Sequence, residues 1–130
     1  IYITGLSMGG RGCWNYEGTI GHKSYAAALV PICGNGQPAL ASQIINTPVW
    51  AFHGEDDEVN KPFVNGGSFQ LVAAINGNDP DYKAKLTIFP GVGHNSWEKT
   101  YDNTGIGTGS PDHDPFDMNI YDWMFQYRKE

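Results

Sequence analysis

Hydrophobic residues in this chain gather in four short runs, at residues 1–4, 25–32, 49–52 and 86–89. Each run has the length of a strand and is followed within two residues by glycine, a residue that favours turns. The runs are almost continuously apolar instead of alternating with polar residues, which is typical of strands buried on both faces. The pattern therefore predicts four strands of a parallel sheet.

Helical patterns occupy the segments between and after these runs. Residues 8–16 can form a helix, although its glycines weaken it, and residues 39–45 can form a short one. The polar residues 95–118 are expected to form a long loop. Alternating strands and helices indicate an α/β domain, a mostly parallel sheet with helices on both faces. Two further helices are predicted from apolar residues at helical spacing, namely Phe69, Val72, Ala73 and Ile75, and then Ile120, Trp123, Met124 and Tyr127.

Composition and charge restrict the class of protein. The chain has 130 residues, of which 40% are hydrophobic and 17% charged, as in an ordinary globular domain. Its formal net charge of −6 argues against nucleic acid and anionic membrane, because both favour clustered Lys and Arg. The longest apolar run, residues 26–33, is too short to span a bilayer. Cys13 and Cys33 lack metal-site spacing, and we expect buried free thiols, with a disulfide as the alternative.

The sequence Gly5-Leu6-Ser7-Met8-Gly9 fits the G-x-S-x-G nucleophile elbow. In that motif a sharp turn from strand into helix exposes the serine hydroxyl, and the flanking glycines let the backbone pass without steric clash. The backbone N–H of Met8 would then point at the developing oxyanion. A Gly-rich turn without catalytic function is the alternative, but a predicted strand before the motif and a predicted helix after it favour a nucleophile.

A base is expected in a loop after a later strand, because α/β sheets place their sites at the carboxyl ends of strands. His94 follows the strand that ends at residue 89, in a loop whose glycines let the imidazole turn back toward Ser7. We expect His53 to brace its turn by hydrogen bonding. The remaining histidines, His22 and His113, lie in polar stretches and are expected to be solvated.

Residues 55–58 supply four carboxylates after the intervening strand, where the acid that orients the histidine should lie. The resulting chain order of serine, acid and histidine is that of α/β-hydrolases. The residue types alone leave the choice among the four acids open. Asp112, His113, Asp114 and Asp117 could be taken for a calcium or zinc site, but they lack the spacing of known motifs, and we expect no metal.

Four blocks with the sequences GLSMGGRGCW, VPICGNG, VWAFHGEDDEV and FPGVGHNSWEKTYD, followed by IYDWM, together resemble a known group of enzymes. The chain resembles the esterase and predicted-peptidase branch of the α/β-hydrolase superfamily, related to polyhydroxybutyrate depolymerase-like, feruloyl esterase-like and dienelactone hydrolase-like enzymes. The resemblance covers nearly the whole chain, in the family's order. It implies a Ser-His-Asp triad of Ser7, His94 and Asp57, with Met8 in the oxyanion hole.

The resemblance also implies further features. Trp14 and Trp97 match aromatic residues that pack beside the site, and Trp97 is a candidate substrate contact. The family needs no cofactor or metal, and its substrates are small-molecule or polysaccharide-linked esters. Secretion or a periplasmic location is compatible with the resemblance, while no membrane or nucleic-acid partner is expected.

The chain departs from the family pattern in three places. In the loop that carries Asp57, here called the acid loop, Asn60 and Lys61 intervene before Pro62. Residues 104–116 form a longer connection to the last helix than is usual in the family. The family's first strands, and the loop that donates the second oxyanion N–H, would all precede Ile1. We therefore expect residues 1–130 to be the C-terminal, catalytic half of an α/β-hydrolase domain.

The leading hypothesis is a serine esterase that forms an acyl-enzyme. A serine peptidase of the prolyl-oligopeptidase type uses the same residues and is the first alternative. A hydrolase fold that only binds ligands is the second, although a decayed site rarely keeps all three residue types.

We predict that residues 1–130 in isolation are inactive and fold poorly, because the sheet would expose an apolar edge strand. Circular dichroism during denaturation and an ester-hydrolysis assay check this expectation. A soluble 130-residue protein that unfolds cooperatively would contradict it.

Overall fold

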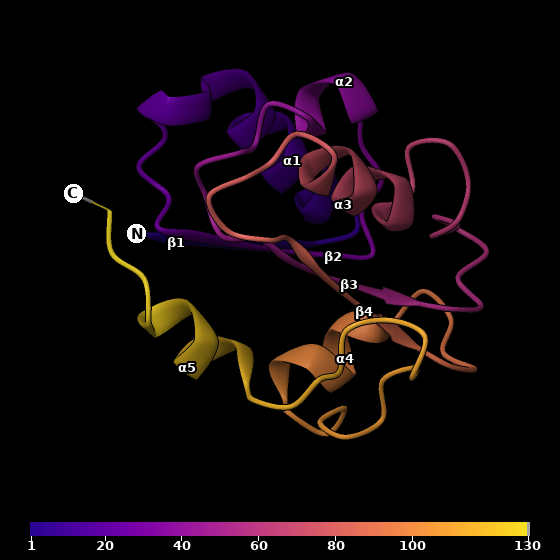
Figure 1. Cartoon of the computed structure of the whole chain (residues 1–130). Coiled ribbons are helices and arrows are strands. Elements are labelled where there is room, and N and C mark those ends of the chain that lie inside the picture. The colour runs from indigo at the N-terminus through magenta and orange to yellow at the C-terminus, as the bar shows by residue number, and fades with distance from the viewer. Residues whose placement is uncertain (130) are drawn as a thin grey trace.

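Four parallel strands form the centre of the molecule in a computed structural model that describes residues 1–129. The strands lie side by side in the order of the sequence (Figure 1). Helices cover the sheet on both faces, so the predicted α/β class with a parallel sheet is confirmed. The strands are β1 (Tyr2–Leu6), β2 (Ala28–Ile32), β3 (Trp50–Gly54) and β4 (Lys85–Phe89).

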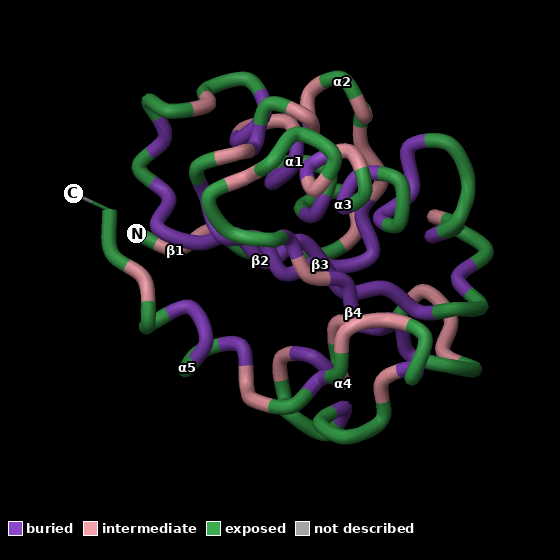
Figure 2. The backbone as a smooth tube through the Cα atoms, viewed as in Figure 1, coloured by how far each residue is buried: buried purple, intermediate pink, exposed green. Residues whose placement is uncertain are grey.

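Strand register brings the carboxyl ends of all four strands to one edge of the sheet. Leu6 of β1 pairs with Ile32 of β2, which pairs with Phe52 of β3, and Gly54 of β3 pairs with Phe89 of β4. Every residue of the central strands β2 and β3 is buried, as the continuous purple along both shows (Figure 2). Burial on both faces explains why their sequences are apolar without alternation.

One face of the sheet is covered by α1 (Met8–Ile20), α2 (Pro38–Ala41) and α3 (Ser68–Asn76). The buried face of α1 contributes Cys13 and Trp14 to the first core cluster, and α3 contributes Leu71 and Ile75. These residues recur at helical spacing, so each helix presents one apolar stripe to the sheet. A short 3-10 helix, η1 (Gly21–Lys23), follows α1 directly.

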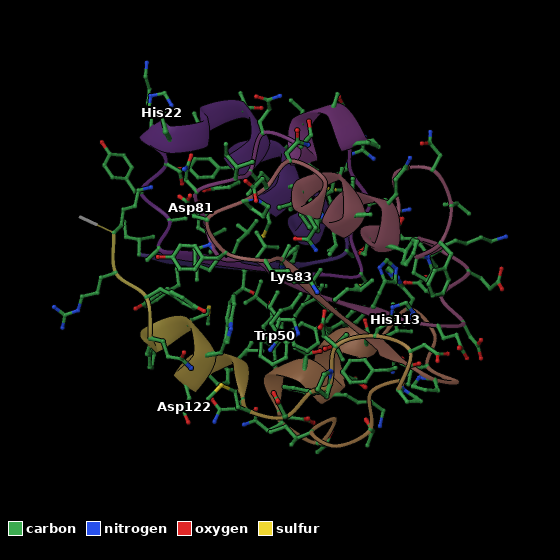
Figure 3. All side chains as sticks on the ribbon, viewed as in Figure 1. His22, Trp50, Asp81, Lys83, His113 and Asp122 are labelled. Carbon is green, nitrogen blue, oxygen red and sulfur yellow. The ribbon has the colours of Figure 1, made fainter. Side chains whose placement is uncertain are left out.

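The opposite face is covered by α4 (Ser96–Tyr101), α5 (Ile120–Phe125) and the segment between them. Its core is aromatic, with the rings of Trp50 and Phe52 at 4.8 Å and those of Trp50 and Trp123 at 5.4 Å. Figure 3 shows Trp50 in the layer between the sheet and these helices. The indole N–H of Trp50 donates to Thr87 Oγ1 at 2.9 Å, so this buried polar group has a partner.

Several predicted boundaries were wrong. The first helix extends to Ile20 instead of residue 16, and α2 spans four residues, Pro38–Ala41, instead of seven. The helix α4 lies inside the segment predicted as loop, because its six residues are too few for a clear apolar period. In α3 the buried side chains include Leu71, while Phe69 is 47% exposed. Tyr127 follows α5 and packs on the second core from outside the helix.

Cys13 and Cys33 are buried free thiols, as expected. Among residues 1–129, no helix is both long and apolar enough to cross a membrane. Glu17 is a buried acid in α1 whose carboxylate accepts hydrogen bonds from Ser24 and Thr47, each at 2.6 Å. These bonds satisfy the carboxylate and tie α1 to the loops before β2 and β3.

Two glycines of α1 should respond oppositely to alanine. A Cβ on Gly10 would lie 2.7 Å from the Ile32 carbonyl oxygen, whereas one on Gly12 would meet nothing within 4 Å. We predict that Gly10→Ala lowers the free energy of unfolding by about 1–3 kcal/mol through overpacking, while Gly12→Ala raises it by up to about 1 kcal/mol through helix propensity. Chemical denaturation of the full-length protein measures both, and equal effects would contradict the proposed contact.

Candidate active site

Ser7 lies in a strained turn between β1 and α1. Its backbone angles are φ 54° and ψ −115°, a region that residues other than glycine rarely occupy. A Cβ on Gly5 would lie 2.5 Å from the backbone carbonyl of Gly9, so the strand and helix approach too closely for larger residues. This conformation places the serine hydroxyl at the carboxyl end of the strand, and such strain is characteristic of functional sites.

A chain of two hydrogen bonds connects Ser7 to an acid. Ser7 Oγ lies 3.0 Å from His94 Nε2, and His94 Nδ1 lies 2.8 Å from Asp57 Oδ2. His94 comes from the loop after β4 and Asp57 from the loop after β3. The three residues are thus distant in sequence, and the parallel sheet brings them together because its strand ends share one edge.

Burial distinguishes Asp57 from the other three acids of its loop. Asp57 is only 2% exposed, whereas Glu55, Asp56 and Glu58 are exposed. Its Oδ1 accepts the backbone N–H groups of Val59 and Asn60, each at 2.9 Å. Its Oδ2 faces the imidazole of His94, so both oxygens of the buried carboxylate have hydrogen-bond partners.

His53 is a buried residue that contacts the acid loop and holds it in place. It is fully buried at the end of β3, with Nδ1 2.7 Å from Ser68 Oγ and Nε2 2.6 Å from the Asn60 carbonyl oxygen. A carbonyl only accepts, so Nε2 carries the proton and Nδ1 accepts from the serine hydroxyl. Nε2 also lies 3.3 Å from Asp57 Oδ2. Burial lowers the pKa of His53, which keeps the imidazole neutral despite this carboxylate.

Cys33 contacts the backbone of Ser7. Its Sγ is 3.3 Å from the backbone nitrogen of Ser7, and its own φ is 46°. Burial raises the pKa of the Cys33 thiol to about 11, so the group is neutral near pH 7 and does not compete as a nucleophile. Ligand atoms of Cys33, Asp57 and His94 lie within 4.8 Å of one another, and within residues 1–129 this is the group of side chains that could hold a metal ion.

Asp114, in the acidic segment 112–117, has a structural role. Asp114 Oδ2 accepts the backbone N–H of Leu86 at 2.8 Å, and Asp114 N–H donates to the Leu86 carbonyl at 2.9 Å. Asp114 therefore anchors this segment along β4. His113 is partly buried against the rings of Phe63 and Phe69, with centroids 5.7 and 5.8 Å away, instead of fully solvated. His22 is exposed and points away from the molecule at η1 (Figure 3).

A pocket of about 230 Å³ opens beside Ser7. A larger pocket of about 410 Å³ lies between α3 and residues 112–114, and none of the candidate catalytic residues lines it. We therefore place the site at the smaller pocket, which is lined by Ser7, the strained serine that His94 contacts at 3.0 Å. The smaller pocket is lined by Ser7, Met8, Arg11, Asn35, Val59 and Asn60.

Met8 and Trp97 occupy different positions at this site. Met8 is the first residue of α1, where backbone N–H groups have no partner inside the helix and attract negative charge. The ring of Trp97 meets that of His94 edge-on, with centroids 5.4 Å apart, and packs against the second core cluster. Trp97 is not among the residues that line the pocket at Ser7.

Asn60 is a residue of the site that the sequence alone did not single out. Its side-chain Nδ2 donates to the Cys33 carbonyl at 2.9 Å, while its backbone carbonyl faces His53 and its N–H faces Asp57. It thereby joins the acid loop to the turn after β2. Its place in the acid loop, where the family pattern is interrupted, is the signal that could have marked it.

No protein-family model matches the chain, and no curated protein sequence matches it significantly. Solved structures do resemble it. A thermostable esterase matches 99% of this chain with a TM-score of 0.76 and 29% identity, over 31% of its own length. The esterase PE8 matches 70% of the chain with a TM-score of 0.53 and 25% identity, over 40% of its length. The Arabidopsis thaliana protein SOBER1 matches 79% with a TM-score of 0.52 and 22% identity, over 50% of its length.

These similarities show that the chain has an α/β-hydrolase fold of the esterase type. The chain spans between about a third and a half of the length of the three structures. The likeness to the thermostable esterase extends over nearly the whole of the present chain.

Protonation of His53 should make stability depend on pH. Because burial lowers its folded-state pKa, the unfolded chain takes up a proton at about pH 6.5 while the folded protein does not. The free energy of unfolding should therefore fall below that pH, by up to about 1.4 kcal/mol per pH unit from this residue.

We predict that His53→Gln flattens this dependence between pH 7 and pH 5, whereas the exposed His22→Gln leaves it unchanged. Urea denaturation of the full-length protein at each pH provides the measurement. Parallel curves for wild type and His53→Gln would show that His53 does not remain neutral in the folded state.

Proposed function

We propose that the protein hydrolyses carboxylic esters through an acyl-enzyme formed on Ser7. The observation that carries the proposal is the chain of hydrogen bonds from Ser7 Oγ through His94 to the buried Asp57, starting at a strained turn. The esterase structures that share the fold support it. A strained, half-buried serine in contact with a histidine has no evident structural purpose, whereas nucleophilic catalysis requires both.

In the first half of the reaction, His94 Nε2 removes the proton of Ser7 Oγ as the oxygen attacks the ester carbonyl carbon. The carbonyl oxygen becomes an oxyanion, which accepts a hydrogen bond from the Met8 N–H. The tetrahedral intermediate then collapses, and the bond to the alcohol oxygen breaks. His94 returns its proton to the leaving alcohol, so that Ser7 carries the acyl group.

In the second half, water replaces the serine as the nucleophile. His94 removes a proton from water as the oxygen attacks the acyl carbon, and Ser7 leaves with that proton. The products are a carboxylic acid and the free enzyme. Every bond change uses groups of the protein and water, so the proposed reaction needs no cofactor or metal.

Asp57 orients the histidine in this scheme. The Nδ1–H group of His94 donates a hydrogen bond to Asp57 Oδ2, so that Nε2 carries no hydrogen and can accept the serine proton. The carboxylate then stabilises the imidazolium that forms. Because Asp57 is itself held by two backbone N–H groups, it keeps its position while the charge on His94 changes.

A second oxyanion donor completes such sites, and we propose that it lies outside residues 1–130, which would form only part of the catalytic domain. The substrates proposed are small-molecule or polysaccharide-linked esters, and neither nucleic acid nor membrane is part of the proposal. A serine peptidase would use the same groups for catalysis, and a ligand-binding module would use none of them for catalysis. Measured hydrolysis of esters and of peptide anilides therefore distinguishes the three functions.

We predict that Ser7→Ala and His94→Ala each lower kcat for p-nitrophenyl acetate in the full-length protein by about 10⁴-fold or more, because triad members act as a unit. Asp57→Asn should also lower it strongly, because it favours the wrong histidine tautomer. The matched control His22→Ala replaces an exposed histidine and should leave the rate unchanged. Release of p-nitrophenolate, followed at 400 nm or thereabouts, is the readout.

The same variants distinguish the alternatives. Faster Ser7-dependent cleavage of a peptide anilide than of any ester would favour a peptidase. Equal rates in wild type and Ser7→Ala for esters and anilides would contradict both enzymatic functions and favour a binding module.

A further inference from the structure

Arg11 shares the pocket of the candidate nucleophile. It lies one helical turn after Ser7 in α1, and its backbone N–H donates to the Ser7 carbonyl at 3.0 Å. The exposed Arg11 side chain lines the 230 Å³ pocket together with Ser7. The pocket therefore contains both the proposed nucleophile and a permanent cation.

The amide nitrogens of the two asparagines that line the pocket are already engaged, while Asn35 Oδ1 has no hydrogen-bond partner in the described part of the chain. Asn60 Nδ2 donates to the Cys33 carbonyl at 2.9 Å, and Asn35 Nδ2 donates to the Lys61 carbonyl at 3.3 Å. By contrast, the Arg11 guanidinium makes no ion pair or side-chain hydrogen bond with any of the residues 1–129. Its N–H donors are available to a ligand.

The charged groups near the pocket are mostly negative, so the cation of Arg11 differs from its surroundings. The neighbouring acid loop exposes Glu55, Asp56 and Glu58, and the protein has a net charge of −6. Lys61, the cation of that loop, already lies 3.6 Å from Glu58. Arg11 is thus the one cation that lines the pocket, in surroundings that otherwise repel anions.

We infer that Arg11 selects esters that carry a carboxylate on the acyl or the alcohol side, because its guanidinium lines the pocket that Ser7 also lines. A guanidinium binds a carboxylate through two parallel N–H···O bonds, which fix orientation as well as charge. Half-esters of short dicarboxylic acids have this chemistry on the acyl side, and carboxyphenyl esters have it on the alcohol side. The inference rests on the ester hydrolysis proposed for Ser7.

The test compares an anionic and a neutral ester of equal chain length, mono-4-nitrophenyl adipate and 4-nitrophenyl hexanoate. The full-length wild type should prefer the adipate in kcat/KM after subtraction of spontaneous hydrolysis. Arg11→Gln should reduce the ratio of the two kcat/KM values by about 10–100-fold, as expected when a charged hydrogen bond is lost. Arg11→Lys should retain part of the preference, because its charge remains without the planar fork.

Arg128→Gln is the matched control, since it removes the same charge from an exposed arginine that does not line the pocket. It should leave the ratio unchanged. The second arm repeats the comparison with 4-carboxyphenyl acetate and its methyl ester, and an Arg11-dependent preference there instead would place the carboxylate on the alcohol side.

Two further results are distinguishable. Ratios that Arg11→Gln leaves unchanged in both arms would overturn the role of Arg11, while Ser7-dependent hydrolysis of the hexanoate would still support the proposed function. Absence of any Ser7-dependent hydrolysis, of neutral or anionic esters, would overturn both.

Discussion

Backbone segments pack against each other almost without clearance where the parallel strands end, and the positions of the candidate catalytic groups depend on this packing. A Cβ on Gly5 would lie 2.5 Å from the Gly9 carbonyl, and one on Gly54 would lie 2.2 Å from the Gly93 carbonyl oxygen. The first contact forces the tight turn at Ser7, and the second seats the loop after β4 on the end of β3. Any side chain at these glycines would separate elements whose side chains must meet within hydrogen-bond distance.

The fold class followed from the sequence because its physical signals were strong. Four runs of apolar residues without alternation required burial on both faces, and helical segments between them required parallel strands. Short elements could not be predicted in the same way. The helix α4 spans only Ser96–Tyr101 and is stabilised by its surroundings instead of its own periodicity. Phe69 fits the helical period of α3, yet its face of the helix borders a pocket and not the core.

The candidate site could also be predicted from the sequence only in part. Ser7 could be singled out because a nucleophile elbow imposes local glycine spacing, and His94 because of its place after a strand. The choice of Asp57 among four consecutive acids needed the family resemblance, since burial and the N–H groups of Val59 and Asn60 depend on the folded loop. A buried carboxylate is costly without such partners, which explains why one acid of the four is enclosed.

Covalent labelling of the full-length protein with a fluorophosphonate tests the central claim, that Ser7 is a nucleophile activated by His94 and Asp57, most directly. Peptide mass spectrometry locates the adduct without any assumption about the natural substrate. The account predicts a single adduct on Ser7 in the wild type, and labelling slowed by orders of magnitude in His94→Ala. An unmodified Ser7 in the folded protein, or labelling that His94→Ala leaves equally fast, would contradict it.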